Sequence, residues 1–394
     1  MLLGIKLRLL IGQVKPVPVP GTLAEALVGV EVTLADTGRS GFQLSFQTGR
    51  SGAADLTDYT LLANPLLRPF NRVILVVTFN GAESVLMDGF ITTTQLAPSE
   101  QPGASTFTVT GEDVSVIMDL EERNATYQGS EDKIAEAILT PTYQRYLASK
   151  PDVKPPRNPR SPSLNDPTPA QGSQTDLAYL NELAQQVGHV FYVTPGPEIG
   201  QNRAYWGPPE RTSGQSALTV NMGPESNVDS INFTFNALAA TVVTGTIRDA
   251  DSDKTQTITA ERTSRTPALA VQQAPTALAR RRTALLYQRP DASDHGPARR
   301  GSMTVPEAQQ FAQAKVDAAA EQTVSVSGEL DALRYGGLLR PHALVGLRGA
   351  GFTFDGKYLV NSVTHTIRAG SYKQRFTLSR EGVGSTVARV GVFG

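Results

Sequence analysis

The sequence predicts a mainly β fold with smaller α+β elements. Three observations indicate this class: apolar and polar residues alternate through residues 1–115, the alternation returns over 323–380, and helical, Pro-rich sequence separates the two. Alternation with a period of two is typical of strands that bury one face. The 35 Gly and 26 Pro residues suit a chain rich in turns.

Residues 1–115 predict a first small antiparallel β-barrel of the tube type. Residues 30–47 alternate on both sides of a Thr-Gly-Arg-Ser-Gly turn, and 71–96 repeat the pattern around Asn80-Gly81. Such pairs of runs are hairpin signals. The run STFTVTGED at 105–113 adds a further strand, so a closed or strongly curved sheet is expected.

Residues 116–212 predict an α+β domain. Ser130 is placed to cap a helix over 129–139, and Pro141 is placed to help end it. A second amphipathic helix within 173–193 is expected to stop at Gly188, before the strand HVFYV. Between them lies the Pro-rich loop 150–171, which we expect to be extended and to form no ladder.

A second β-barrel is predicted from 213–249 and 323–380, which makes it discontinuous in the chain. The inserted segment 250–322 is expected to be loop-rich, with one Ala- and Gln-rich helix over 305–321 that begins near Pro306. Residues 381–394 are expected to form a C-terminal tail. A 394-residue chain suggests about two to four domains by size, which fits this division.

Composition excludes several functional classes. Lys+Arg 36 against Asp+Glu 37 leaves a net charge of -1, so nucleic acid is not expected as a specific ligand. The absence of cysteine excludes disulfides and thiol chemistry. The apolar run VILVVTF at 73–79 is far shorter than the ~20 residues of a membrane helix, so we expect no membrane insertion. Charges interrupt the apolar residues of MLLGIKLRLLIG, so no signal peptide is expected.

The stretch FDGKYLVNSVTHTI at 354–367 gathers an Asp, a Lys, a Tyr and a His. Asp355-Gly356 predicts a tight hairpin turn in which Gly supplies a positive φ. On the following strand His365 shares a face with Val363 and Ile367. This position favours a packed histidine over a catalytic one.

No other pattern completes a catalytic or metal site. The sequence has no G-x-S-x-G, no H-E-x-x-H and no phosphate-binding loop. His189 lies at a helix-to-strand joint, His295 in a polar loop and His342 after a proline. The acidic runs at 249–253 and 120–123 lack the placement of a calcium loop. We therefore predict no catalytic, cofactor-binding or metal-ligating residue and no cofactor.

The basic residues gather in one segment, at 280–300. Arg280, Arg281 and Arg282 are followed by Arg289, Arg299 and Arg300. Such a run of arginines can bind the phosphates of nucleic acid. With a neutral chain and no interleaved aromatics, a solvated or partner-facing surface is the preferred interpretation.

Several segments together resemble the late control gene D family, the baseplate hub proteins of contractile phage tails and contractile injection systems. The resemblance lies in the spacing of 118–139, 173–193 and 226–249. It continues in the closing order of a helix at 306–321, the turn Gly-Leu-Leu-Arg-Pro at 337–341 and the strands of 344–380. There an F-x-G-x-Y turn, a V-x-H strand and an F-x-L-x-R strand follow one another, as in that family.

The resemblance implies two similar β-barrels in each subunit, one of them interrupted, and a homotrimer. Three copies of two like barrels present six near-equivalent units, so a trimer can join a hexameric inner tube to a trimeric spike. The implied partners are the inner tube or a tube-initiator protein, baseplate wedge proteins and a spike. The spike is expected to be a separate chain, since only EGVGSTVARVGVFG follows residue 380. The implied place is a phage virion or a contractile injection particle, assembled in the bacterial cytoplasm.

Two alternatives from other classes stay open. A cell-wall hydrolase associated with a phage tail would carry its site in 173–210 or in the insertion. A carbohydrate-binding β protein would need clustered exposed aromatics, and Trp206 is the sole tryptophan. The non-enzymatic hub is the preferred interpretation.

Overall fold

The computed structural model describes most of the chain. The described residues are 5–13, 15–49, 59–101, 104–147, 150–159, 171–196, 198–212, 214–249, 252, 254–273, the backbone of 281–284, and 304–387.

The dominant element is one sheet of 13 strands that draws on both ends of the chain. Its main path is β14-β19-β22-β21-β3-β4-β7-β6-β5-β1-β2, and β20 with β13 attaches to β21. The strands are β1 (Ile5–Gly12), β2 (Val17–Pro18), β3 (Leu27–Ala35), β4 (Gly41–Thr48), β5 (Arg72–Phe79), β6 (Ala82–Ala97), β7 (Ser105–Asp113), β13 (Leu218–Thr219), β14 (Val228–Phe235), β19 (Val324–Asp331), β20 (Leu344–Arg348), β21 (Gly356–Arg368) and β22 (Ser371–Arg380).

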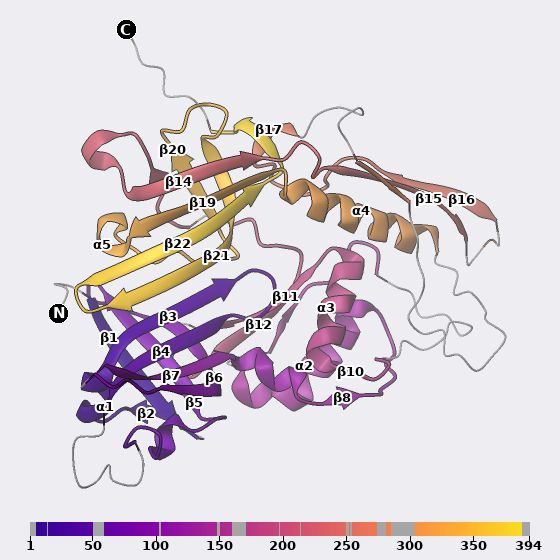
Figure 1. Ribbon diagram of the computed structural model, residues 1–394. Helices are drawn as coiled ribbons and strands as arrows, with labels where there is room; N and C mark the ends of the chain where they lie inside the picture. Colours follow the sequence, from indigo (N-terminus) through magenta and orange to yellow (C-terminus); the bar gives the residue numbers. More distant parts are fainter. Residues whose placement is uncertain are drawn as a thin grey trace.

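Helices and four small sheets complete the fold (Figure 1). The helices are α1 (Gly21–Ala26), α2 (Glu131–Tyr143), α3 (Asp176–Val187), α4 (Val305–Glu321) and α5 (Ala332–Tyr335). The small sheets pair β8 (Glu122–Arg123) with β10 (Gln174–Thr175), β11 (Val190–Pro195) with β12 (Asn202–Gly207) and β9 (Asp152–Val153), β15 (Thr241–Arg248) with β16 (Thr255–Ala260) and β18 (Arg281–Ala284), and β17 (Ala270–Gln273) with β23 (Gly382–Ser385). Among the described residues, no helix is long and apolar enough to cross a membrane.

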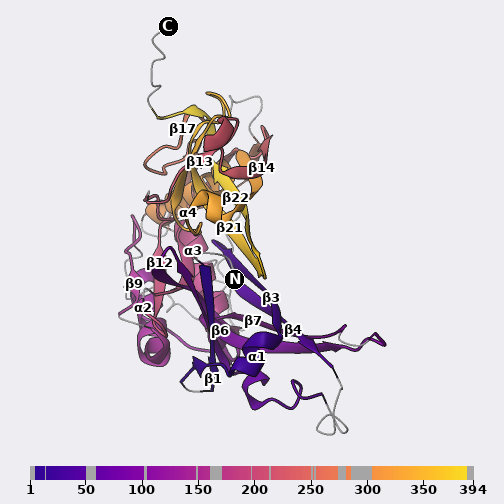
Figure 2. The same cartoon turned by 90° about the vertical axis from the view of Figure 1, so that its left-hand side faces the viewer.

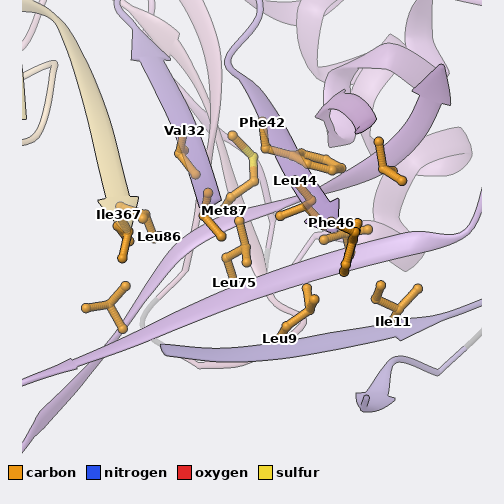
Figure 3. Close-up of a cluster of buried hydrophobic side chains, with 14 of the residues drawn as sticks. Leu9, Ile11, Val32, Phe42, Leu44, Phe46, Leu75, Leu86, Met87 and Ile367 are labelled. Carbon is orange, nitrogen blue, oxygen red and sulfur yellow. The ribbon is translucent and has the colours of Figure 1, made fainter. Parts of the chain in front are cut away.

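The N-terminal region, residues 5–113, curls around one apolar core. Alternate side chains of β1 and of β3 to β7 meet in a single buried cluster, which also includes Ile367 of β21, Tyr372 of β22 and Ala332 of α5. Figure 3 shows part of it, with Ile367 beside Leu86. The hairpins predicted at the Thr-Gly-Arg-Ser-Gly turn, residues 37–41, and at Asn80-Gly81 are present; the first loop spans 36–40, and Asn80 and Gly81 have φ 49° and 83°. One buried cluster fed by six neighbouring strands requires a strongly curved sheet.

The first predicted barrel is not confirmed, because no closed sheet is found in the described part of the chain. Closure would need β3 to pair with β1, the other end of the curled strands. Instead the outer edge of β3 pairs with β21, from Ser362 opposite Ala35 to Arg368 opposite Gly29. The backbone groups that would close the barrel are thus used to join the two ends of the chain.

The C-terminal region, residues 218–235 and 324–380, surrounds a second apolar core. Its path β13-β20-β21-β22-β19-β14 is also open. The two end strands are bridged by hydrogen bonds between Thr219 and Asn227, including the Asn227 N–H to the Thr219 carbonyl at 3.1 Å, and not by a ladder. The second barrel is therefore not confirmed either. Figures 1 and 2 show β21 and β3 side by side where the two regions meet.

A third core lies between α2, α3, β11 and β12. Helix α3 is capped by the Thr175 hydroxyl and ends at Gly188, which has φ 72°, as the sequence predicts. Helix α2 differs from the prediction, since it runs through Pro141 to Tyr143. The helix ends two residues after Pro141, and its end is held by the buried Tyr143, whose hydroxyl donates to Asp176 at 2.6 Å.

The Pro-rich segment is a loop that forms a short ladder, contrary to the sequence expectation. Asp152 and Val153 pair in parallel with Tyr205 and Trp206, and the Lys154 N–H donates to the Trp206 carbonyl at 2.8 Å. The ladder is possible because these residues lie between prolines, and it stays short for the same reason. Residues 160–170 of this segment lie outside the described residues.

The inserted segment is more ordered than predicted. Strand β15, assigned by sequence to the second barrel, pairs instead with β16 of the insertion. Both cover helix α4, whose capping box joins Thr304 and Glu307. Likewise β23, within the predicted tail, pairs with β17. Strand β15 pairs with β16 outside the large sheet because the apolar stripe of α4, Ala308, Ala312 and Val316, buries the inner side chains of these two strands, Val243, Ile258 and Ala260.

Candidate functional site

The face of the large sheet opposite the two cores is uniformly polar across eight strands. None of its residues is buried, whereas the residues that alternate with them are mostly buried. We name it the polar face and define it by Ser230, Asn232 and Thr234 of β14, Ser325, Ser327 and Glu329 of β19, Lys373, Arg375 and Thr377 of β22, Ser362, Thr364 and Thr366 of β21, Glu31 and Thr33 of β3, Gln43, Ser45 and Gln47 of β4, Thr106, Thr108 and Thr110 of β7, and Thr93 and Gln95 of β6.

Neighbouring side chains on the polar face are matched across strands. The hydroxyls of Thr33 and Thr364 lie 3.0 Å apart across the junction of β3 and β21. The Arg375 guanidinium donates to Glu329 at 2.9 Å. Glu31 and Glu329 lie on the face together with Lys373 and Arg375, and the register adds Asp331, Arg368 and Glu112 at its margins. The face therefore presents mainly hydroxyl and amide groups with charges of both signs, which are readily hydrated.

The polar face ends on both sides in an unpaired strand edge. Within the described residues, β14 pairs only with β19. Strand β6 pairs with β5 only as far as Phe90 opposite Arg72, so its residues 92–97 pair with β7 alone. All pairs from β14 to β6 are antiparallel. Since the path has an even number of strands, the two edge strands run in opposite directions.

A cleft of about 850 Å³ lies beside the polar face, between α3, α4 and the ends of β21 and β22. Arg265, on its wall, donates to Glu321 at 3.2 Å. Two buried polar atoms of the wall, Nδ1 of His189 and Oγ of Ser379, have no hydrogen-bond partner among the described residues. The cleft holds no hydrogen-bonded pair of nucleophile and base in the described part of the chain.

Of the three described histidines, His189 and His365 are buried and His342 is half-buried, and the pKa of each is lowered. Burial lowers the pKa of His189 to about 4, with a smaller effect of the Arg265 charge, and that ring lies 4.6 Å from the Trp206 ring. Burial lowers the pKa of His342 to about 3, and its ring stacks on Tyr192 at 3.4 Å.

His365 is fully buried where the alternation places it, and burial lowers its pKa to about 3. Its Nδ1 lies 3.0 Å from the Tyr372 hydroxyl. No hydrogen bond joins any of the three described histidines to a carboxylate, so none has the orienting partner that a general base needs. His295 lies outside the described residues.

The DGKY segment is structural, although its turn differs from the prediction. The loop between β20 and β21 spans seven residues, 349–355, where a tight two-residue turn is predicted. Gly356 has φ 127°, as expected for its role. The Asp355 carboxylate accepts the Ala350 N–H at 2.8 Å, and the buried Arg380 donates to the carbonyls of Asp355 and Thr353. These polar bonds inside the loop explain its greater length.

The remaining sequence candidates form no site in the described residues. No group of three or more His, Asp or Glu side chains there is arranged to hold a metal ion. Asp249 accepts hydrogen bonds from Ser252 and from the Val305 N–H, so it caps local backbone. Of the Arg-rich segment only the backbone of 281–284 is described, in β18.

Sequence reasoning located the strands of the polar face but did not single it out. The signal was present: Ser, Thr and Gln fill the alternate positions of QLSFQ, TFTVT and THTIR. Alternation defines two faces of a strand without showing which one meets a core. The register across β3 and β21 was needed to join the two halves of the face.

Comparisons by sequence give no match, neither to a family model nor to a curated protein. Comparison with solved structures gives several matches. The tail protein of Neisseria meningitidis MC58 is similar over 97% of this chain and 98% of its own, with 13% identity and a TM-score of 0.62. The 43 kDa tail protein of prophage MuSo2 from Shewanella oneidensis covers 96% and 98%, with 14% identity and a TM-score of 0.59.

A third similar structure is the E. coli c3393 protein, a component of the type VI secretion system that exhibits structural similarity to the phage T4 tail proteins gp27 and gp5. It is similar over 89% of this chain and 73% of its own, with 14% identity and a TM-score of 0.53. At such identities the likeness shows the fold. The chain has the fold of phage tail proteins and of a type VI secretion component.

Proposed function

We propose that this protein is a structural, non-enzymatic baseplate hub of a contractile tail or injection system. The observation that carries the proposal is the polar face, which runs without interruption through both regions of the large sheet. The shared fold with two tail proteins and a type VI secretion component supports it. A wide, hydrated face suits a wall along which other molecules pass.

In this proposal the subunits form a homotrimeric ring by strand pairing. The β14 edge of one subunit pairs with residues 92–97 of β6 in the next, which keeps the pairing antiparallel. Because the two edges differ, the contact is head to tail, and it closes into a ring of three when each contact turns the next subunit by one third of a full turn. The polar faces of all subunits then line one continuous passage, and the two apolar cores lie outside it.

The ring acts as an adaptor between the hexameric inner tube and the trimeric spike. The two cores of each subunit supply the near-equivalent units that a sixfold partner needs. We propose the inner tube or a tube initiator, a separate spike chain and baseplate wedge proteins as partners. Assembly takes place in the bacterial cytoplasm, and the product belongs to a phage virion or an injection particle.

Cysteine crosslinking tests the ring, because the chain has no native cysteine. Ser230, Asn232 or Thr234 is changed to Cys together with Gln95→Cys, which samples the register along the two edges. Oxidation is expected to give covalent trimers in at least one double variant and none in the single variants. Native mass spectrometry of the unmodified protein is expected to show a trimer.

Thr108→Cys provides the matched control. Thr108 lies directly opposite Gln95 on β7, one strand further from the edge. Strands are about 4.8 Å apart, so the Cα atoms of Thr108 and of a β14 residue in the next subunit are about 10 Å apart, too far for a disulfide. Equal crosslinking through residue 108, or a stable monomer in the native mass spectrum, would contradict the ring.

A further inference from the structure

Strand β16 has an open outer edge that carries none of the usual protection. Within the described part of the chain, β16 pairs only with β15, through six consecutive residue pairs without a bulge. Its sequence, TQTITA, has no charge and no proline. Proteins protect exposed strand edges with lysine, proline, bulges or very short strands. The edge strand β2 follows that rule, since it has two residues and contains Pro18.

One side-chain contact shows which backbone groups of β16 point outward. The Gln309 side-chain amide of α4 donates to the Thr259 carbonyl at 3.1 Å. In an antiparallel ladder, alternate residues direct both their N–H and C=O groups to the same neighbour. Thr259 therefore turns its backbone away from β15, and Thr255 and Thr257 do the same. The edge offers a row of donors and acceptors, of which the Thr259 carbonyl is already used.

The side chains around this edge define the strand that fits it. Ile258 and Ala260 are buried against α4, whereas Thr255, Gln256 and Thr257 are exposed. An added strand would place alternate side chains over the same small core and the others beside the threonines. It needs small or apolar residues at the inner positions and no charge there, since the core around α4 is apolar.

We propose that an extended segment of a partner protein adds to β16 as a further strand of the β16-β15-β18 sheet. This is strand addition, in which main-chain hydrogen bonds supply affinity and alternate side chains supply specificity. Figure 1 shows β15 and β16 projecting with α4 from the rest of the molecule. The inference does not depend on the ring.

A different chain fits this edge better than a second copy of β16. In a two-fold pair centred on Thr257, Thr255 of one copy lies opposite Thr259 of the other. The Thr259 carbonyl is already occupied by Gln309, so the pairs at both ends of the shared ladder must compete with that amide. A two-fold pair centred on Gln256 avoids Thr259, but then Thr255 and Thr257 are the only outward-facing residues left to bond to the other copy. A partner strand is not limited by this symmetry and can pair along the edge from residue 255 without competing for the Thr259 carbonyl.

The test uses the full-length protein and a labelled peptide as the strand probe. The peptide Thr-Val-Val-Thr-Gly-Thr-Ile-Arg copies residues 241–248, the sequence that already pairs with the inner edge of β16. Thr257→Pro removes one outward N–H and leaves the bonds to β15 intact. Thr257→Ala keeps that N–H and is the matched control. Peptide binding is measured by fluorescence anisotropy, and native mass is recorded for each variant.

We expect the wild type and Thr257→Ala to bind the peptide within about twofold of each other. Thr257→Pro is expected to bind at least about tenfold more weakly, which corresponds to ~1.4 kcal/mol. A scrambled peptide of the same composition is expected to bind no better than the proline variant. Hydrogen exchange of the unliganded wild type is expected to show a fast Thr257 amide, which the peptide slows.

Three results would overturn the inference. Equal peptide binding by Thr257→Pro means that the edge is not the binding site. A slow Thr257 amide in the unliganded protein means that another part of the same chain already covers the edge. Self-association that the proline substitution abolishes, without peptide binding, assigns the edge to a second copy.

Discussion

The two regions of the large sheet solve the same packing problem with different side chains. Each curls one face of its strands around an apolar core, and each stays open. The N-terminal region buries its core almost entirely with aliphatic and phenyl groups. Both regions also bury polar side chains: Asn71, Arg72, Asp88 and Asp113 in the N-terminal region at 1–9% exposure, and His365, Gln374 and Arg380 in the C-terminal region at 0% exposure.

In both regions buried polar groups hold the connections between strands. The N-terminal region has the tight turn Asn80-Gly81, but its longer connection from β4 to β5 is held by the buried Asn71 amide, which donates to the Pro65 and Leu66 carbonyls. Longer loops interrupt the C-terminal region, and its buried polar groups hold them. The Gln374 amide donates to the Gly337 carbonyl and accepts the Leu339 N–H, both at 2.8 Å. Interrupted regions need polar anchors because their loops carry backbone groups into the core.

Removing the strongest anchor is the most severe test of this comparison. Arg380 donates to two loop carbonyls and lies 4.4 Å from the centre of the Tyr358 ring. Arg380→Ala leaves those two carbonyls without a hydrogen-bond donor and opens a cavity. We therefore expect the free energy of unfolding to fall by about 3–5 kcal/mol. Urea unfolding followed by circular dichroism measures it.

Arg8→Ala is the matched change in the N-terminal region. Arg8 pairs with Glu83 at 3.0 Å, with both side chains about half exposed. Exposed ion pairs contribute about 0–1 kcal/mol, so we expect the free energy of unfolding to fall by no more than that. Similar losses for Arg380→Ala and Arg8→Ala would show that Arg380 is not an anchor.

Acid is expected to act on the two regions with opposite sign. Burial lowers the pKa of His342 and His365 to about 3, from an ordinary 6.5. The unfolded chain therefore binds more protons below pH 6.5, and stability falls as pH falls. At pH 5 each histidine is expected to cost about 2 kcal/mol.

The N-terminal region has no histidine, but burial raises the pKa of Asp113 to about 6 although it accepts the Ser40 and Ser115 N–H groups. A raised carboxyl pKa gives stability that is present at low pH and lost as pH rises through 6. Hydrogen exchange at pH 7 and pH 5 is expected to show weaker protection in β21 and β22 at pH 5, with β4 and β7 unchanged or better protected. A uniform loss in both regions would refute the contrast.

The sequence predicts the local elements of this fold but not the contacts between distant parts of the chain. The strands, the ends of α3 and α4 and the burial of His365 follow from local patterns, because period, caps and positive-φ glycines act over a few residues. The pairing of β21 with β3 joins residues more than 320 positions apart. No local pattern states that pairing, so two closed barrels were expected and one open sheet was found.

The hydrogen bond between the buried side chains of His365 and Tyr372 tests the role of one buried polar contact in the C-terminal region. His365→Gln keeps a polar group but not the ring, and Tyr372→Phe removes the hydroxyl at 3.0 Å. We expect losses of about 2 and about 1 kcal/mol in the free energy of unfolding. Since the groups share one bond, the double variant should lose less than the sum. Strict additivity, or a folded His365→Gln protein that has lost a measurable hydrolytic activity, would point instead to a role beyond packing.

The smallest expected effect concerns the junction itself. Thr364→Val removes the hydroxyl contact with Thr33 across β21 and β3 and keeps a β-branched side chain. We expect a loss of about 0.5 kcal/mol in the free energy of unfolding. Thr106→Val, also on the polar face, is the control and is expected to be neutral. If both changes are neutral, the seven residue pairs of the β21-β3 ladder hold the two regions together without help from side chains. If Thr364→Val costs several times more than expected, the junction depends on that hydroxyl pair, and the two regions are less independent than their separate cores indicate.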